Sequence, residues 1–573
     1  MTAPEPAAPA PPAEEDGRSG PPPRGSRAAV VAAGILASRL AGLVRVRAAA
    51  YFFGLGPHAD VLEAALRGPN LLQNLLGEGT VSAAFIPVYS RLLEAGRERE
   101  AGRFAGAIFG LLLALAAALS LAGMLLARPV VALLTPGFAG DAARIAAGEL
   151  TVDRFELAVT AVRIIFPMTG VLTLSAWALG VLNSHRRFFL PYVAPVAWNA
   201  AILAGLAAGA WAAFGEPVPA EPSALPAGAL GRVLIAACWG ALAGGVAQFA
   251  VQLPLVVRLL RGFRPSLSTR VAGVREALAA FGPVVAGRGV YQLSGYLDLL
   301  LASLLATGAL GALRYAQVLY LLPIGLFGLS VAAAELPELA RLKGDELAPF
   351  FRRLRGSLAQ MMFLTLPTAF GYLAFGSVLV AALYRTGSFG GADNRLVYLL
   401  LCAYTLGLPA TTASRLLQNS FYALSETRVP ARIAVLRVAV SVAVAVPLMF
   451  WLDRFPVAVG EAAGPAGDPL FLGALGLAAG SAVGAWVELI ALRRALAVRL
   501  PGFTPPWRAL ARSAALAAVA LAPAVALAWA LPAGWHPAPR ALAVVAVYSS
   551  AYLGGARLLG VPELSAWLGR LGR

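Results

Sequence analysis

The sequence predicts an all-α polytopic membrane protein of about 14 transmembrane helices, built as two six-helix lobes related by a parallel pseudo-repeat plus two C-terminal helices. Three observations support this fold class. Hydrophobic residues make up 59% of the 573 residues and charged residues only 13%, against roughly a quarter charged in soluble domains. The apolar residues form successive runs of about 20 residues, the length that crosses a bilayer. Two sequence motifs also recur in the second half of the chain.

Composition also excludes several classes of function. The net charge of +17 does not indicate nucleic-acid binding, because the arginines lie between apolar runs and not on a soluble module with interleaved aromatics. Three histidines fall in predicted loops, and no nucleophile–base or metal-ligand spacing accompanies them. No P-loop is present. We therefore expect a transporter and not an enzyme, with no cofactor, no bound metal and no nucleic-acid partner.

The chain divides into four parts. Residues 1–27 are rich in Pro, Ala and Gly and predict a disordered tail. The N-lobe is expected over 28–260, the C-lobe over 261–500, and the last two helices with a short tail over 501–573. The predicted helices span 28–53, 60–93, 104–127, 151–183, 188–214, 228–260, 274–306, 312–341, 348–382, 393–424, 429–452, 470–498, 508–532 and 537–560.

The distribution of arginine predicts the orientation. Positively charged loops stay in the cytoplasm, and every second connection is basic if both termini are cytoplasmic. These connections hold Arg97, Arg99 and Arg103; Arg186 and Arg187; Arg258, Arg261, Arg264 and Arg270; Arg341, Lys343, Arg352, Arg353 and Arg355; Arg428 and Arg432; and Arg493, Arg494 and Arg499. The intervening loops, such as "GLGPHAD", are acidic or neutral.

The internal repeat relates the two lobes. "VSAAFIPVYSRLLEAGRERE" at 81–100 resembles "VAAAELPELARLKGDE" at 331–346, and "LNSHRRFFLP" at 182–191 loosely resembles "LSETRVP" at 424–430. Six predicted helices separate the copies of the first motif. Because six is an even number, both halves have the same orientation, which predicts a pseudo-twofold axis along the membrane normal and a central cavity between the lobes.

The first helix carries charges that its position does not readily explain. Arg39 lies about 17 Å along it at 1.5 Å per residue, too deep to reach the lipid headgroups easily. A charge at that depth is costly and is expected to face the bundle interior or water. Ser38, Gly42 and Arg45 form a small polar stripe, whereas Arg47 is expected to extend toward the headgroups. A structural ion pair within the bundle is the alternative interpretation of Arg39 and Arg45.

The second helix has a polar line on one side, and Gly68, Pro69, Gly77 and Gly79 allow it to bend. A membrane helix has no free solvated face, so this line must border a wet cavity or pair with other helices. It consists of Asp60, Glu63, Arg67, Asn70, Asn74 and Glu78. Further buried polar groups are expected at Arg163, Asn199, Gln292, Asp298 and Arg314. Since the planar guanidinium suits phosphate oxygens, the arginines predict a ligand whose headgroup carries phosphate.

The longer motifs carry a family resemblance. "SRLAGLVR", "FFGLGPHAD", "RGPNLLQNLLGEGTVSAAFIPVYSRL", "LYLLPIGLFGLSVAAAELPEL" and "FYALSETRVPARIA" together resemble the MurJ (MviN) family of lipid II flippases. The resemblance implies a 14-helix transporter of the multidrug/oligosaccharidyl-lipid/polysaccharide exporter superfamily in the bacterial inner membrane. The substrate it implies is lipid II, the undecaprenyl-diphosphate-linked peptidoglycan precursor, moved from the inner to the outer leaflet. It also implies that the last two helices form a groove for the lipid tail.

The family pattern transfers only in part. Ser38, Arg39, Arg45, Asp60, Asn70 and Glu78 stand where the family motif has them, but the family's cavity arginines on helices 2 and 8 fall at Gln73 and Val318. The expected substrate-binding residues are Ser38, Arg39, Arg45, Asp60, Arg67, Asn70, Gln73, Asn74, Glu78 and Arg314. Some members bind a cation in the C-lobe. Of those ligands only Asp298 has a match, so a sodium site is not expected, and Asp298 stays a candidate ion or buried polar site.

The substitutions at Gln73 and Val318 keep three interpretations open. The first is a lipid II flippase whose phosphate contacts have moved to the remaining arginines, working by alternating access. The second is a transporter of another polyprenyl-linked glycan or amphiphile. The third is a membrane scaffold for cell-wall synthesis that transports nothing. The expected partners are lipid II, membrane lipids and proteins of cell-wall synthesis.

Overall fold

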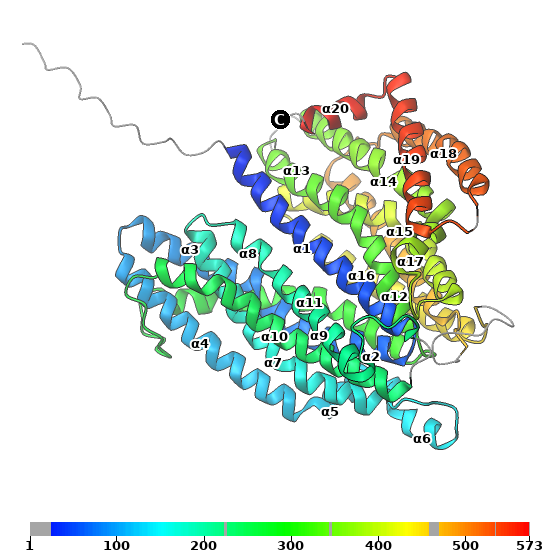
Figure 1. Cartoon of the computed structure of the whole chain (residues 1–573). Helices are drawn as coiled ribbons and strands as arrows, with labels where there is room; N and C mark the ends of the chain where they lie inside the picture. The colour runs from blue at the N-terminus through cyan, green and yellow to red at the C-terminus, as the bar shows by residue number, and fades with distance from the viewer. Residues whose placement is uncertain (1–23, 223–225, 343–346, 458–468, 533, 572–573) are drawn as a thin grey trace, which may run out of the picture.

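The computed structural model describes residues 24–222, 226–342, 347–457, 469–532 and 534–571, and their regular structure is helical (Figure 1). The helices of the N-lobe are α1 (Arg24–Phe53), α2 (Pro57–Leu76), α3 (Glu78–Glu94), α4 (Glu98–Leu125), α5 (Ala127–Leu134), η1 (Pro136–Gly140), α6 (Asp141–Ala146), α7 (Arg154–Ser184), α8 (Phe189–Val193), α9 (Pro195–Phe214) and α10 (Ala227–Leu259).

The C-lobe and the C-terminal region follow in the same way. The C-lobe contains α11 (Val274–Ser303), α12 (Ala309–Pro323), the π-helical turn η3 (Ile324–Leu329), α13 (Ser330–Arg341), α14 (Leu347–Tyr384), α15 (Gly391–Ala423), α16 (Arg428–Leu452) and α17 (Gly473–Arg499). The C-terminal helices are α18 (Trp507–Ala530), α19 (Pro537–Leu558) and α20 (Pro562–Leu571), and they pack against α14.

Each of the 14 predicted spans overlaps a helical segment. Eleven helices in the described residues are long and apolar enough to cross a membrane; the segments at α1, α2–α3 and α11 are not among them. The count of 14 therefore stays a prediction, as do the lobe boundaries at residues 260 and 500. α1 begins at Arg24, four residues inside the predicted tail, whereas residues 1–23 lie outside the described residues. The short helices α5, α6 and α20 were not predicted.

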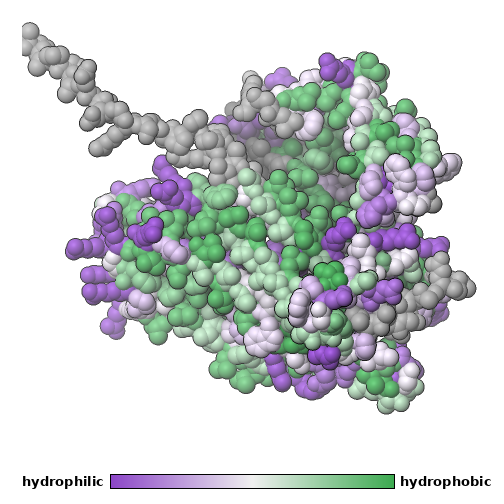
Figure 2. All heavy atoms as spheres, viewed as in Figure 1, coloured by the Kyte–Doolittle hydropathy of each residue, from purple (hydrophilic) through white to green (hydrophobic). Residues whose placement is uncertain are grey.

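Figure 2 shows hydrophobic surface across the middle of the molecule, with hydrophilic surface gathered near the α3–α4 loop and near α6.

The predicted repeat is visible in the backbone. Each first-motif helix follows a break in regular α-helix: α3 follows Gly77, and α13 follows η3. At the second motif the chain leaves α7 and α15 through the same turn, because Arg186 and Ser425 both adopt left-handed φ values of 59° and 62°. A positive φ is uncommon for residues other than glycine. Its occurrence at matching positions therefore supports two copies of one structural unit.

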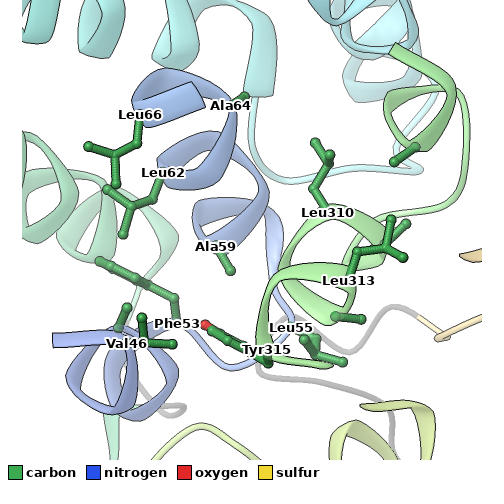
Figure 3. Packing of buried hydrophobic residues seen from close by; sticks show 14 of the residues in the cluster. Val46, Phe53, Leu55, Ala59, Leu62, Ala64, Leu66, Leu310, Leu313 and Tyr315 are labelled. Carbon is green, nitrogen blue, oxygen red and sulfur yellow. The ribbon is translucent and has the colours of Figure 1, made fainter. Parts of the chain in front are cut away.

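The buried core shows how the lobes meet. One large cluster contains residues of both lobes, including Val46, Phe53, Leu62, Leu313 and Tyr315 (Figure 3). We call the end where Phe53–Ala59 meets Gly308–Ala312 the junction end. Toward the other end the clusters separate, one between α3, α4 and α7 and another between α13, α14, α15 and α17. We call this the arginine end, since the basic connections lie there. The core that α1, α2 and α12 share thus lies near the junction end, whereas at the arginine end the start of α11 packs against α3 and α4.

Candidate functional site

The candidate site is the polar seam where α1 and α2 of the N-lobe face α12 of the C-lobe. Exposure of the α2 stripe increases toward the arginine end: Asp60 and Glu63 are buried, Arg67 and Asn70 are half-buried, and Asn74 is exposed. Burial of these polar groups is greatest where α2 packs in the core that it shares with α12. The seam is therefore closed at the junction end and accessible from the arginine end.

Arg45 lies in the closed part of the seam. Its Nε donates a 2.9 Å hydrogen bond to Asn199 Oδ1, and its guanidinium stands over the Trp198 ring at 5.1 Å. Both partners lie on α9. Gly42, one turn earlier on α1, also faces Asn199. The prediction that Arg45 faces the bundle interior is confirmed, and so is the burial of Asn199.

A second arginine shares this part of the seam. Arg314 of α12 lies 3.5 Å from the Glu63 carboxylate, and its buried Nε has no hydrogen-bond partner among the described residues. Arg314 thus has an ion-pair partner in Glu63, whereas Arg45 has a neutral partner, Asn199, and no ion pair with any described residue. The local charge is positive, and a buried cation without an ionic partner, such as Arg45, favours an anionic ligand.

The next polar contact toward the arginine end also crosses the seam. Arg67 Nη2 donates a 3.0 Å hydrogen bond to Gln317 Oε1, and Gln317 Nε2 donates to Tyr404 Oη at 3.1 Å. Tyr296 of α11 donates to the Arg67 carbonyl oxygen at 3.1 Å. Arg67 is thus held by α11 and α12 of the C-lobe, and any separation of the lobes here would break these contacts.

Arg39 is the most exposed arginine of the seam. It lies six residues before Arg45, or about 9 Å along α1. Its guanidinium rests against η3, where a Cβ atom added at Gly325 would be 2.7 Å from Arg39 Nη1. The absence of a side chain at Gly325 is what allows this approach. Arg39 and Arg45 therefore occupy successive positions along the seam and do not form one pair.

Asp60 has a different environment from the other predicted substrate contacts. It is 1% exposed and accepts hydrogen bonds from the amides of Gly308 and Gly311 at 2.7 and 3.0 Å, at the start of α12. Arg154 of α7 lies 3.5 Å from the same carboxylate. A carboxylate at a helix N-terminus satisfies amides that the helix leaves unpaired. In this conformation Asp60 joins the two lobes at the junction end.

Asp298 lies outside the seam, in a small pocket of the C-lobe. The pocket is bordered by α11, α16 and α17 and also contains Arg437, Ser441 and Ser481. Arg437 is bound to Glu488, with Nη1 2.8 Å from Oε2, and Gln418 donates to the other Glu488 oxygen at 2.8 Å. A protein guanidinium therefore already supplies positive charge beside Asp298. This charge disfavours a metal cation there, and the absence of a sodium site stays a prediction.

The remaining predicted residues are scattered along the seam. Ser38, Gln73 and Val318 are half-buried, and the side chain of Glu78 lies outside the described residues, as does that of Gln292. Arg47 does not extend freely, since it donates to the Ala382 carbonyl oxygen of α14 at 3.0 Å. The prediction of a buried Arg163 is wrong: its side chain is exposed on α7. A long arginine side chain on an outward helix face reaches solvent or headgroups instead.

Sequence reasoning missed three residues that shape the site. Trp198, Gln317 and Gly325 contact Arg45, Arg67 and Arg39 from helices far away in the chain. Gln317 had a usable signal, because it follows Arg314 by three residues and so lies on the same face of a helix. Trp198 and Gly325 had none, since each depends on which helices meet.

Comparison with known proteins identifies the family. The family model described as "Lipid II flippase MurJ" matches residues 49–537. A probable lipid II flippase MurJ from Rhizobium meliloti is 34% identical over 76% of this chain and 77% of its own length. Lipid II flippase MurJ from Burkholderia cenocepacia is 31% identical over 70% and 73%.

Solved structures give the same fold. A structure of lipid II flippase MurJ in an inward closed conformation has a TM-score of 0.68 at 19% identity, covering 93% of this chain and 99% of that one. An inward-facing multidrug resistance MATE family transporter of the MOP superfamily has a TM-score of 0.56 at 16% identity, covering 81% and 96%. With the family model matching most of the residues, the chain belongs to the MurJ family of lipid II flippases.

Proposed function

We propose that this chain flips lipid II by alternating access, and that the lipid diphosphate is held between the lobes by Arg39, Arg45 and Arg314. As a member of the family, it is a multi-pass protein of the bacterial inner membrane and a transporter, not an enzyme. The observation that carries the proposed site is the charge balance at the seam: Arg314 pairs with Glu63, whereas the buried Arg45 makes no ion pair with any described residue. A diphosphate would supply the missing negative charge.

The order of the arginines suggests a route for the headgroup. Arg39 is exposed and lies nearest the arginine end, so a phosphate entering between the lobes reaches it first. Arg45 and Arg314 lie deeper and come from opposite lobes. A diphosphate that bridges them draws the lobes together. The ligand thereby binds the closed state better than the open one, which is the condition for it to shift the equilibrium.

Release on the other side requires the junction end to open. The bonds from Asp60 to the amides of α12 then have to break, together with the bond from the Ser388 hydroxyl to the Phe52 carbonyl oxygen. We assign the junction end to the outer face and both termini to the cytoplasm, on the basis of the basic connections at the arginine end. Contact with proteins of cell-wall synthesis stays a prediction.

The missing family arginines favour one alternative substrate class. Gln73 and Val318 reduce the positive charge of the seam, which would suit a polyprenyl-linked glycan with fewer phosphate charges. Transport of lipid II and of an undecaprenyl-monophosphate glycan into the opposite leaflet of proteoliposomes distinguishes the two substrates. We expect lipid II to be the better one, because Arg39, Arg45, Arg67 and Arg314 remain in the seam.

Complementation tests the function directly. The chain is expressed in a bacterium depleted of its own lipid II flippase, and growth is scored beside the amount of protein in the membrane. Rescue is the expected result, with loss of rescue for Arg45→Ala at normal membrane levels. Failure of the unchanged chain at normal levels, combined with no flipping of lipid II in proteoliposomes, would overturn the proposal.

A further inference from the structure

An open groove of about 590 Å³ lies on the N-lobe, away from the seam arginines. It runs between the segment that leads into α7 and the first half of α10, beside the start of α2. Its apolar walls are Leu157, Gly231, Ile235, Ala236 and Trp239. None of the seam arginines borders it, so lipid II transport as proposed above does not account for the groove.

The apolar part of the groove follows one face of α10. Gly228, Arg232, Ile235 and Trp239 are spaced by four, three and four residues, so they lie in a row about 16 Å long. Gly228 and Gly231 leave the groove hollow near the start of the row. A Cβ atom at Gly231 would only approach His58 at 3.9 Å, and one at Gly228 would meet nothing within 4 Å. Trp239 closes the far end and is 56% exposed. A row of this length inside a membrane fits part of an acyl chain.

The mouth of the groove is polar and carries both signs of charge. Arg232 is exposed and makes no hydrogen bond or ion pair with any described residue. Asp153 is half-buried and caps α7, where its Oδ1 accepts the Glu156 amide at 3.0 Å. Its second oxygen accepts no hydrogen bond within the part of the chain that the structure describes. One cation and one carboxylate with spare bonding capacity thus lie at the mouth of an apolar channel.

The depth of the groove in the membrane agrees with its division into a polar mouth and apolar walls. α10 has 33 residues and is about 50 Å long, whereas a bilayer measures about 40–45 Å including its headgroups. Arg232, five residues after the start of α10, therefore lies at headgroup level, and Trp239 lies within the hydrocarbon. Polar and apolar ends of the groove match the polar and apolar layers of the leaflet.

We propose that the groove is a binding site for a zwitterionic phospholipid of the phosphatidylethanolamine type. The phosphate accepts hydrogen bonds from the Arg232 guanidinium, the ammonium group donates to Asp153, and an acyl chain lies along Ile235, Ala236 and Trp239. Because the mouth holds one positive and one negative group, it complements a neutral zwitterion better than an anionic headgroup. The proposed topology places this lipid in the outer leaflet.

Lipid competition on the purified full chain tests the site. The protein is delipidated, incubated with equal amounts of phosphatidylethanolamine and phosphatidylglycerol, and the bound lipids are counted by native mass spectrometry. We expect a preference for phosphatidylethanolamine. Arg232→Gln removes a charge-assisted contact and should weaken its binding about tenfold. Arg258→Gln, an exposed arginine in the last turn of the same helix, is the matched control and should change nothing.

A second pair of variants separates charge from apolar contact. Asp153→Asn keeps a good helix cap but leaves the mouth positive, so the preference should turn toward phosphatidylglycerol. Gly231→Leu fills the hollow and should reduce both lipids equally. The proposal is overturned if the unchanged protein prefers phosphatidylglycerol, if Arg232→Gln and Asp153→Asn bind as the unchanged protein does, or if undecaprenyl phosphate displaces phosphatidylethanolamine from the groove.

Discussion

At the scale of single residues, Arg45 and Arg47 of α1 show what sequence can and cannot predict. The depth of Arg45 in an apolar helix was enough to predict that it faces the interior, because a charge in lipid is costly. Its partners Asn199 and Trp198 are about 150 residues away, and no local pattern points to them. Arg47 lies only two residues further on, yet contacts the α14 carbonyl oxygen of Ala382. The depth of an arginine in the membrane predicts whether its side chain is buried, whereas its partners depend on which helices meet.

The first prediction concerns Arg45. If the diphosphate is held by planar two-pronged contacts, Arg45→Lys should weaken lipid II binding by about tenfold to a hundredfold, equivalent to roughly 1.5–3 kcal/mol for a charge-assisted contact. Flipping in proteoliposomes should fall accordingly, with the protein still inserted. Arg47→Lys is the control and should remain nearly active, since lysine can also donate to the Ala382 carbonyl oxygen.

A purely structural role for Arg45 gives a different result. In that case Arg45→Ala lowers the melting temperature, and combining it with Glu63→Gln restores stability and function, because the second change removes the negative charge that Arg45 balanced. Normal binding and flipping by a well-folded Arg45→Ala protein would refute the proposed phosphate contact.

At the scale of helices, close packing between α16 and α17 depends on small residues. A Cβ atom at Gly480 would lie 2.6 Å from the Ser441 carbonyl oxygen and 2.7 Å from Ala445 Cβ. Membrane helices use such small residues to bring their backbones together. The helices themselves were predictable from apolar runs, but this contact was not, because Gly480 and Ala445 do not stand out among the many small and apolar residues of both helices.

The second prediction follows from that contact. Gly480→Leu should destabilise the protein by about 1–3 kcal/mol, the usual cost of inserting extra atoms into a packed interface. Thermal unfolding in detergent measures the change. Gly554→Leu on α19 is the control, since nothing lies within 4 Å of a Cβ atom there. Equal melting temperatures for the two variants would show that α16 and α17 do not pack as described.

The third prediction concerns the pocket of Asp298. Arg437 already places a positive charge in this pocket, so replacing sodium with potassium in proteoliposomes should leave the rate of lipid II flipping unchanged. Arg437→Ala removes that charge and is the informative variant: it should lower stability through the unpaired Glu488. A strong sodium requirement of the unchanged protein would show that a cation binds despite Arg437.

At the scale of the whole molecule, the repeat was predictable and the junction between its copies was not. The copies share motif residues and the same positive-φ turn, a local property that sequence records. The α2 stripe, to which Asp60 belongs, was expected to border a wet cavity or to pair with other helices. Asp60 pairs with the amides of α12. A stripe specifies a face of a helix, but burial along that face depends on how far the two lobes are separated at each level.

The last prediction tests the orientation of the two ends. Arginines gather at the end away from the junction, and positive connections stay in the cytoplasm, so the junction end should face outward. A cysteine at Gly140, exposed in the η1–α6 segment near that end, should react with a membrane-impermeant maleimide in intact cells. A cysteine at Ala95, exposed after α3 at the arginine end, should react only after the membrane is permeabilised. The background protein carries Cys402→Ser, because the other native cysteine, Cys238, is buried. The reverse labelling pattern would invert the molecule, and the headgroup would then have to enter from the outer side, contrary to the direction proposed for lipid II.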